Sequence, residues 1–145
     1  MNARPIESRD VESILEIQSA SPEVAQWTAW DYGRVARGEM AGWIAEENGE
    51  LLAFLVARRV GSDIEILNFA VRPETRRRGV GGTLLRAALD WGAELHAQKA
   101  LLEVRASNFP ALHFYERHGF RVVGRRPRYY GSPIEDALLL SADLR

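Results

Sequence analysis

The sequence contains no cysteine among its 145 residues. A disulfide scaffold, a zinc site built on thiolates and a cysteine nucleophile are therefore excluded. Long apolar runs are also absent, because no stretch approaches the roughly 20 apolar residues that a membrane-spanning helix needs. The segment 1–5 lacks the apolar core of a signal peptide. These absences predict a soluble cytoplasmic protein without a membrane partner.

The sequence has almost no net charge, since 19 Lys and Arg and 20 Asp and Glu give a formal charge of -1. Arginine is concentrated at 76–78 and 125–128, whereas acidic residues dominate 46–50. Nucleic-acid binding requires one coherent basic face, so we expect no nucleic-acid partner. The three histidines, at 96, 113 and 118, show no metal-ligand spacing. We therefore expect no metal.

The pattern of apolar residues predicts one α/β domain over 1–145, a length that can bury a single hydrophobic core. Asn48-Gly49 and Gly61-Ser62-Asp63 are hairpin signals between strands. The predicted order is β-α-α-β-β-β-α-β-α-β-β, which indicates a mixed sheet with one parallel join. The helices are predicted at 8–17, 28–35, 79–96 and 108–118, and the assigned strands at 42–46, 51–60, 64–71, 100–104, 120–124 and 136–140.

An arginine-glycine segment, RRRGVGG at 76–82, joins the strand that ends before Pro73 to the next helix. Glycines permit a tight turn, and the first N–H groups of a helix can bind a phosphate or pyrophosphate. Thr83 can add a hydroxyl donor. The pattern is neither G-x-x-x-x-G-K-S/T nor G-x-G-x-x-G, so an ordinary P-loop or Rossmann site does not fit. Alternatively, the glycines only shape the turn and the arginines are solvated.

Three motifs in order resemble those of the GNAT superfamily of N-acetyltransferases. The first is R-x-x-G-x-G from Arg76 to Gly81, followed by the helix that contains Thr83. The second is LEVRASN at 102–108, and the third is N-x-x-A-x-x-x-Y-x-x-x-G-F at 108–120. The LEVRASN segment and Arg128-Tyr129-Tyr130 most resemble the ribosomal-protein-alanine N-acetyltransferases. The resemblance covers nearly the whole chain and implies the GNAT fold, a mixed α/β sheet in the order given above.

This resemblance implies acetyl-coenzyme A (acetyl-CoA) as the co-substrate. The pantetheine arm is expected to pair with the end of the strand at 64–71, which requires a bulge that the sequence does not reveal. Backbone amides of the arginine-glycine segment are expected to hold the pyrophosphate. The implied cofactor-binding residues are Phe69, Ala70, Val71, Arg77, Arg78, Gly79, Val80, Gly81, Gly82 and Asn108.

The resemblance also implies two catalytic residues. Glu103 matches the general base that takes a proton from the acceptor amine, and partial burial would make its carboxylate a stronger base. Tyr115 matches the general acid that protonates the departing thiolate. Each residue has a second interpretation: Glu103 as a rim carboxylate paired with an arginine such as Arg105, and Tyr115 as a core side chain on one helix face.

The acceptor amine is the least defined feature. The resemblance favours the N-terminal amine of a protein, in particular a ribosomal protein, and the expected substrate-binding residues are Trp27, Thr28 and Tyr130. The ribosomal-protein-alanine N-acetyltransferases usually have Pro-Trp-Ser where this chain has Gln26-Trp27-Thr28, so acceptor choice can differ. The alternatives are a small-molecule amine, a lysine side chain, or a catalytically silent acetyl-CoA sensor. We expect a monomer or a homodimer.

Overall fold

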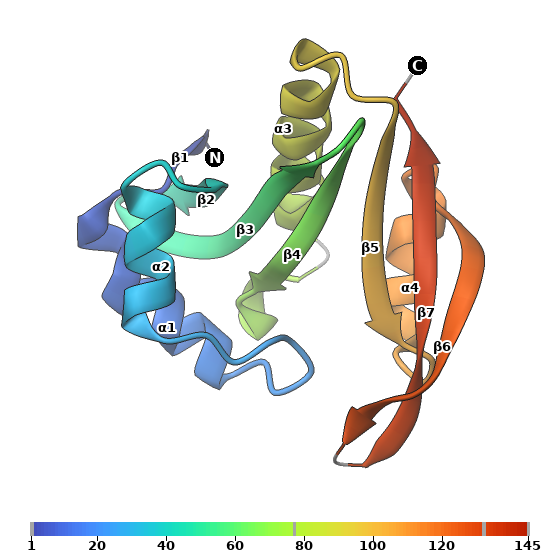
Figure 1. The fold of residues 1–145 in the computed structure, drawn as a ribbon. Helices are drawn as coiled ribbons and strands as arrows, with labels where there is room; N and C mark the ends of the chain where they lie inside the picture. The colour runs from blue at the N-terminus through green and yellow to red at the C-terminus, as the bar shows by residue number, and fades with distance from the viewer. Residues whose placement is uncertain (1, 77, 132, 145) are drawn as a thin grey trace. The chain divides into compact units, whose positions relative to one another are not determined.

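A computed structural model of the chain describes residues 2–76, 78–131 and 133–144. Its described helices and strands follow the predicted order (Figure 1). Short 3-10 turns precede α1 and follow β4, at Ser8–Asp10 and Pro73–Thr75. The helices are α1 (Val11–Ser19), α2 (Ala29–Ala36), α3 (Val80–Glu94) and α4 (Phe109–Arg117). The strands are β1 (Asn2–Pro5), β2 (Ala41–Glu47), β3 (Glu50–Val60), β4 (Asp63–Val71), β5 (Lys99–Arg105), β6 (Arg121–Gly131) and β7 (Ile134–Asp143).

The strands form a seven-stranded mixed sheet in the order β1-β2-β3-β4-β5-β7-β6. The pairs β1–β2, β2–β3, β5–β7 and β6–β7 are antiparallel. The parallel ladder joins β4 to β5 through Ile64 opposite Ala100 and Glu65 opposite Leu101. This ladder is the parallel join that the sequence predicted, and the mixed α/β fold is confirmed.

Local signals explain where several elements begin and end. Asn48 and Gly49 both have a positive φ, 53° and 81°, as a type I′ turn between antiparallel strands requires. At the start of α2, the Asp31 N–H donates to Thr28 Oγ1 at 3.2 Å, and the Thr28 N–H donates to Asp31 Oδ2 at 2.8 Å. This reciprocal capping box confirms that Thr28 begins the second helix.

The last two strands are much longer than predicted, because β6 extends to Gly131 and β7 begins at Ile134. The sequence at 125–128 is rich in arginine, and alternating apolar residues do not mark it as a strand. Since β6 lies at the edge of the sheet, its charged side chains can remain in solvent. The β6–β7 register shifts between Arg126 and Tyr130, where β6 contains extra residues opposite β7.

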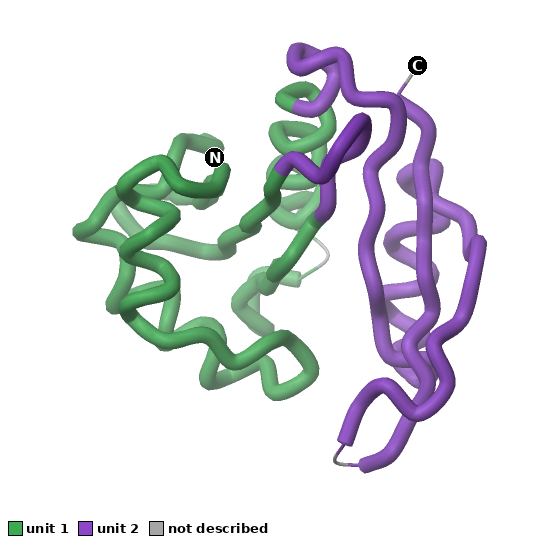
Figure 2. Tube along the Cα trace, viewed as in Figure 1, with its two compact units in different colours: residues 1–58, 66–91 green, residues 59–65, 92–145 purple. Residues whose placement is uncertain are grey.

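The chain divides into two compact units (Figure 2). Unit 1 comprises 1–58 and 66–91, and unit 2 comprises 59–65 and 92–145. The two units interleave along the chain, so the division does not separate two consecutive domains. One domain over 1–145 stays a prediction. Among the described residues, every helix is too short or too polar for a bilayer crossing.

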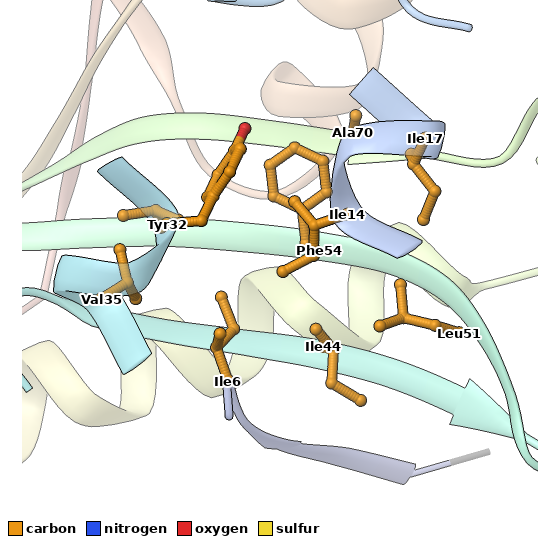
Figure 3. Packing of buried hydrophobic residues seen from close by; sticks show 10 residues of the cluster. Ile6, Ile14, Ile17, Tyr32, Val35, Ile44, Leu51, Phe54 and Ala70 are labelled. Atoms are coloured by element: carbon orange, nitrogen blue, oxygen red, sulfur yellow. The ribbon is translucent and has the colours of Figure 1, made fainter. Parts of the chain in front are cut away.

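The main apolar cluster of unit 1 combines side chains from α1, α2, β2, β3 and β4 with Ile6, which follows β1 (Figure 3). Tyr32 is fully buried within it, and its ring meets Phe54 edge to face at 5.5 Å between centroids. Figure 3 shows the Tyr32 hydroxyl oxygen beside the β4 ribbon. The cluster contains Ile6, Ile14, Ile17, Tyr32, Val35, Ile44, Leu51, Phe54, Val56 and Ala70.

Candidate active site

The arginine-glycine turn leads into α3 with a backbone suited to an anion. Gly79 has a φ of +80°, and its carbonyl accepts the Thr83 N–H at 3.1 Å. The N–H groups of Val80, Gly81 and Gly82 have no backbone acceptor among the described residues. These N–H groups lie at the positive end of the helix, where a phosphate group would be stabilised.

Side chains of the turn differ in two respects from expectation. The Thr83 hydroxyl donates to the Gly79 carbonyl at 3.0 Å. Its donor is therefore used at the start of its own helix and does not point toward a phosphate. The flanking arginines are ion-paired and not simply solvated: Arg76 with Glu23 at 3.5 Å and Arg78 with Glu47 at 2.7 Å. Exposed pairs of this kind contribute little stability, so an incoming phosphate can compete with the carboxylate. The Arg77 assignment lies outside the described residues.

We expect Gly79→Val to lower the free energy of unfolding by about 1–2 kcal/mol, because a side chain at positive φ crowds its own backbone. An added Cβ would meet no atom within 4 Å, so backbone strain alone accounts for the loss. Gly79→Asn is the matched control, since Asn tolerates this conformation. The free energy of unfolding should fall clearly less in this variant than in Gly79→Val. Urea unfolding measures both. Equal losses for Val and Asn would contradict the assignment of strain to φ.

The end of β4 carries the three residues expected to meet the pantetheine arm. Ala70 is buried, whereas Phe69 and Val71 are half-buried on the alternate side of the strand. The preceding residue, Asn68, is buried in the alternating register of Ile64, Ile66 and Ala70. The β4–β5 pairing at Ile64 and Glu65 does not reach these residues, so the bulge stays a prediction.

Asn108 begins α4 in unit 2. Its Oδ1 accepts the Ala111 N–H at 3.3 Å and caps the helix. Its Nδ2 has no acceptor among the described residues. The expected cofactor contact of Asn108 can therefore use the amide N–H₂ group while the oxygen keeps its structural role.

Glu103 on β5 has two carboxylate oxygens in different surroundings. Oε1 pairs with the Arg126 guanidinium from β6 at 3.3 Å. Oε2 is buried and accepts no hydrogen bond among the described residues. The side chain retains 20% exposure. Glu103 thus carries a buried oxygen with unused acceptor capacity, which is uncommon in folded proteins.

The arginine that the sequence offered as a partner of Glu103 is not the one observed. Arg105 instead pairs with Glu135 at 3.4 Å, and its guanidinium carbon lies 4.2 Å from the centre of the Tyr130 ring. The observed partner, Arg126, comes from the extended part of β6 and lies over the Tyr129 ring at 5.1 Å. The sequence does not indicate Arg126 as a site residue, because nothing in its pattern shows that β6 extends this far.

Tyr130 lies close enough to Glu103 for the two groups to interact electrostatically. Burial raises the pKa of Tyr130 above its ordinary value, and the negative charge of Glu103 raises it further. Unit 2 therefore brings together the predicted base and one predicted substrate-binding residue. The Tyr130 hydroxyl stays protonated at neutral pH and can donate a hydrogen bond.

Tyr115 is a buried residue on α4, 9% exposed. Its ring packs edge to face against Phe114 at 5.3 Å and Phe120 at 5.5 Å. Burial raises the pKa of the phenol well above its usual range. The packing agrees with the interpretation of Tyr115 as a core side chain, and the protonated hydroxyl is also what a proton donor requires.

Trp27 and Thr28 lie in the loop at 20–28 between α1 and α2. Both backbone groups of Trp27 bond to the Gln18 side chain: the Trp27 N–H donates to Oε1 at 3.0 Å, and Nε2 donates to the Trp27 carbonyl at 2.8 Å. The Thr28 hydroxyl donates to Asp31 Oδ2 at 3.0 Å. The loop is thus attached to both flanking helices.

Other candidate groups show no site chemistry. The described part of the chain contains no group of three or more His, Asp or Glu arranged to hold a metal ion. Trp30 is 65% exposed and lies under the Arg34 guanidinium at 5.3 Å. Trp43 and Trp91 pack together at 5.6 Å in unit 1.

Comparison with known proteins identifies related sequences and structures. A family model described as "Acetyltransferase (GNAT) family" matches residues 8–120. A Bacillus subtilis (strain 168) protein, provisionally named a ribosomal protein bS18-alanine N-acetyltransferase, is 33% identical over 139 residues, or 94% of this chain and 91% of the relative.

Two solved structures extend the comparison. The crystal structure of the ribosomal-protein-S18-alanine N-acetyltransferase from Escherichia coli has a TM-score of 0.85 at 25% identity, covering 99% of this chain and 93% of the other. The crystal structure of nourseothricin acetyltransferase has a TM-score of 0.70 at 30% identity, covering 75% and 68%. The names of the two proteins indicate different acceptors.

Proposed function

The chain belongs to the acetyltransferase (GNAT) family and is an N-acetyltransferase, and we propose that its acceptor is the N-terminal α-amine of a protein. The acetyl donor of the reaction is acetyl-CoA, which supplies a thioester-activated acetyl group. The observation that carries the proposed mechanism is the unequal environment of the two Glu103 oxygens, one ion-paired and the other buried without a partner among the described residues.

Glu103 acts in the proposal as the general base. An α-amine has a pKa of about 7.7–8.0 and is mostly protonated at neutral pH, so it must lose a proton before it can attack. Oε2 accepts this proton, directly or through one water, because Oε1 is already engaged with Arg126. A buried carboxylate oxygen without a hydrogen bond gains from accepting one.

Tyr115 acts as the proton donor to the leaving sulfur. Its burial keeps the phenol protonated, and the hydroxyl donates as the carbon–sulfur bond breaks. A thiolate, whose conjugate thiol has a pKa of about 8.5, is a stable leaving group and needs only a modest donor. The ring contacts with Phe114 and Phe120 fix the hydroxyl's direction.

In this proposal acetyl-CoA binds through the cofactor-binding residues named above. The N–H groups of Val80, Gly81 and Gly82 would bind the pyrophosphate with the positive φ of Gly79 shaping the approach. Arg78 would add a cation once it exchanges Glu47 for a phosphate oxygen. Phe69 to Val71 would meet the pantetheine arm, and Asn108 stays a predicted cofactor-binding residue whose Nδ2 can donate a hydrogen bond.

The acceptor assignment rests on the names of the relatives and on three residues. Trp27 and Thr28 would form one wall for the acceptor, and Tyr130 stays a predicted substrate-binding residue. The Bacillus subtilis and Escherichia coli proteins support a protein N-terminus, in particular that of a ribosomal protein. The 30% identity to nourseothricin acetyltransferase favours a small-molecule amine as the second candidate.

We expect turnover on a peptide that begins with alanine, and little or none on polyamines, nourseothricin or a peptide with a blocked N-terminus. The test is a steady-state assay with acetyl-CoA and peptides beginning with Ala, Ser, Gly or Met. Turnover only on a polyamine or nourseothricin would overturn the acceptor assignment. Binding of acetyl-CoA without turnover on any amine would favour the silent sensor.

A further inference from the structure

Three polar side chains in unit 1 occupy positions where the surrounding pattern is apolar. Asn68 on β4, Gln18 on α1 and Tyr32 on α2 are 4%, 5% and 0% exposed. Their neighbours in the same register are aliphatic, as with Ile66 and Ala70 beside Asn68. Burying polar groups costs free energy unless they are hydrogen-bonded, so the bonds that they form indicate what they hold in place.

Asn68 uses all of its amide donors. Nδ2 donates to the Ala25 carbonyl at 2.9 Å and to the Tyr32 hydroxyl at 2.9 Å. Oδ1 accepts the Phe69 N–H at 3.2 Å. One side chain therefore connects the end of β4, where the cofactor arm is proposed to lie, to the loop at 20–28.

Tyr32 and Gln18 extend this connection to Trp27. The Tyr32 hydroxyl accepts from Asn68 and donates to Gln18 Oε1. Gln18 bonds both backbone groups of Trp27, at 2.8 Å and 3.0 Å. The network thus runs from β4 through α2 and α1 and holds the loop at two points, Ala25 and Trp27.

We propose that Asn68 is a positioning residue that fixes the loop at 20–28 in the conformation that selects the acceptor. The inference rests on the proposed function, in which Trp27 and Thr28 contact the acceptor. Asn68 itself need not touch either substrate. Because its bonds reach both β4 and the loop, it sets the distance between the wall that receives the acceptor and the strand that receives the acetyl donor.

Replacing Asn68 by the isosteric leucine removes both donors and leaves the Ala25 carbonyl without its partner. We expect Asn68→Leu to raise the acceptor-peptide KM about tenfold, since a displaced binding wall costs binding and orientation. It should also reduce the preference for alanine over methionine at the first position. The KM for acetyl-CoA should change by less than about twofold, because the pyrophosphate turn is unaltered.

Tyr32→Phe gives a graded second variant. It breaks the link from Asn68 to Gln18 but keeps the Asn68 bond to Ala25 and both Gln18 bonds to Trp27. We expect its acceptor KM to lie between those of the wild type and Asn68→Leu. Ile64→Val is the stability control, because Ile64 is fully buried in unit 2, whereas Asn68, Gln18 and Tyr32 belong to unit 1.

Kinetics with both substrates and a thermal melt of each variant distinguish positioning from simple destabilisation. A purely structural role would lower the melting temperature and kcat while leaving KM and the acceptor preference unchanged, as expected for Ile64→Val; that result for Asn68→Leu would overturn the inference. If the wild type acetylates no peptide N-terminus, the proposed function fails. If it does, and Asn68→Leu keeps its acceptor KM and preference, only the inference fails.

Discussion

Glu103→Gln should lower kcat/KM by about 10²–10⁴ at neutral pH, the range that general acid–base catalysis contributes. Glutamine keeps the size of the side chain and can still accept a hydrogen bond, but it cannot take the proton from an ammonium group. The variant then depends on the small fraction of acceptor that is already deprotonated. The loss should therefore reside in the chemical step and not in acetyl-CoA binding.

The pH dependence gives this prediction its sharpest form. Below the α-amine pKa of about 7.7–8.0, the neutral fraction falls tenfold per pH unit. In Glu103→Gln, log kcat/KM should rise with a slope near one between about pH 6 and 7.5, whereas the wild type should show a shallower profile. The variant's deficit is thus largest at low pH. Identical profiles would remove Glu103 as the base.

Glu135→Gln is the matched control for Glu103→Gln. Both glutamates are largely buried and ion-paired with an arginine in unit 2. The oxygens of Glu135 are both engaged, Oε1 with Arg105 at 3.4 Å and Oε2 with the Ser107 N–H at 2.6 Å. Neither oxygen of Glu135 is thus without a hydrogen-bond partner. Glu135→Gln should leave the pH profile of kcat/KM unchanged.

Tyr115→Phe should lower kcat by about 10² while CoA binding stays nearly intact, because only a proton donor is lost. The phenylalanine ring can keep the contacts with Phe114 and Phe120. Burial raises the pKa of Tyr115, so the donor form persists throughout the neutral range and no loss of rate from its ionisation is expected below about pH 10.

Calorimetric titration with CoA and single-turnover kinetics separate the two effects in Tyr115→Phe. Tyr129→Phe is the control, because Tyr129 is 51% exposed and its ring lies against Arg126. Unchanged turnover in Tyr115→Phe would show that Tyr115 is a core residue without a catalytic role. A large loss of CoA affinity would show that its hydroxyl supports the binding site instead of the chemistry.

Local signals account for the parts of the fold that could be predicted. The reciprocal bonds of Thr28 and Asp31 and the positive φ values at Asn48 and Gly49 depend only on residues close in sequence. The long β6–β7 hairpin could not be predicted in this way, because an edge strand needs no apolar alternation. The sequence of the arginine cluster at 125–128 therefore does not indicate that the cluster belongs to a strand.

In the candidate site too, the sequence predicts the features that depend on neighbouring residues and not those that depend on distant ones. The proposed anion-binding turn follows from a local glycine pattern, and Gly79 adopts the positive φ that this pattern indicates. The partner of Glu103 depends on a register shift in a strand more than 20 residues away, so the sequence suggested Arg105 where Arg126 is found. Asn68 did leave a signal, a polar residue within the buried alternation of β4, but its partners became visible only in the folded chain.

The position of the acetyl group on a single peptide tests the central claim most directly. The peptide carries an N-terminal alanine and one internal lysine, and its control has the same sequence with a blocked N-terminus. After incubation with the enzyme and acetyl-CoA, fragmentation mass spectrometry locates the modification. We predict one acetyl group on the alanine α-amine and none on the blocked peptide. Acetylation of the lysine in both peptides would contradict the account.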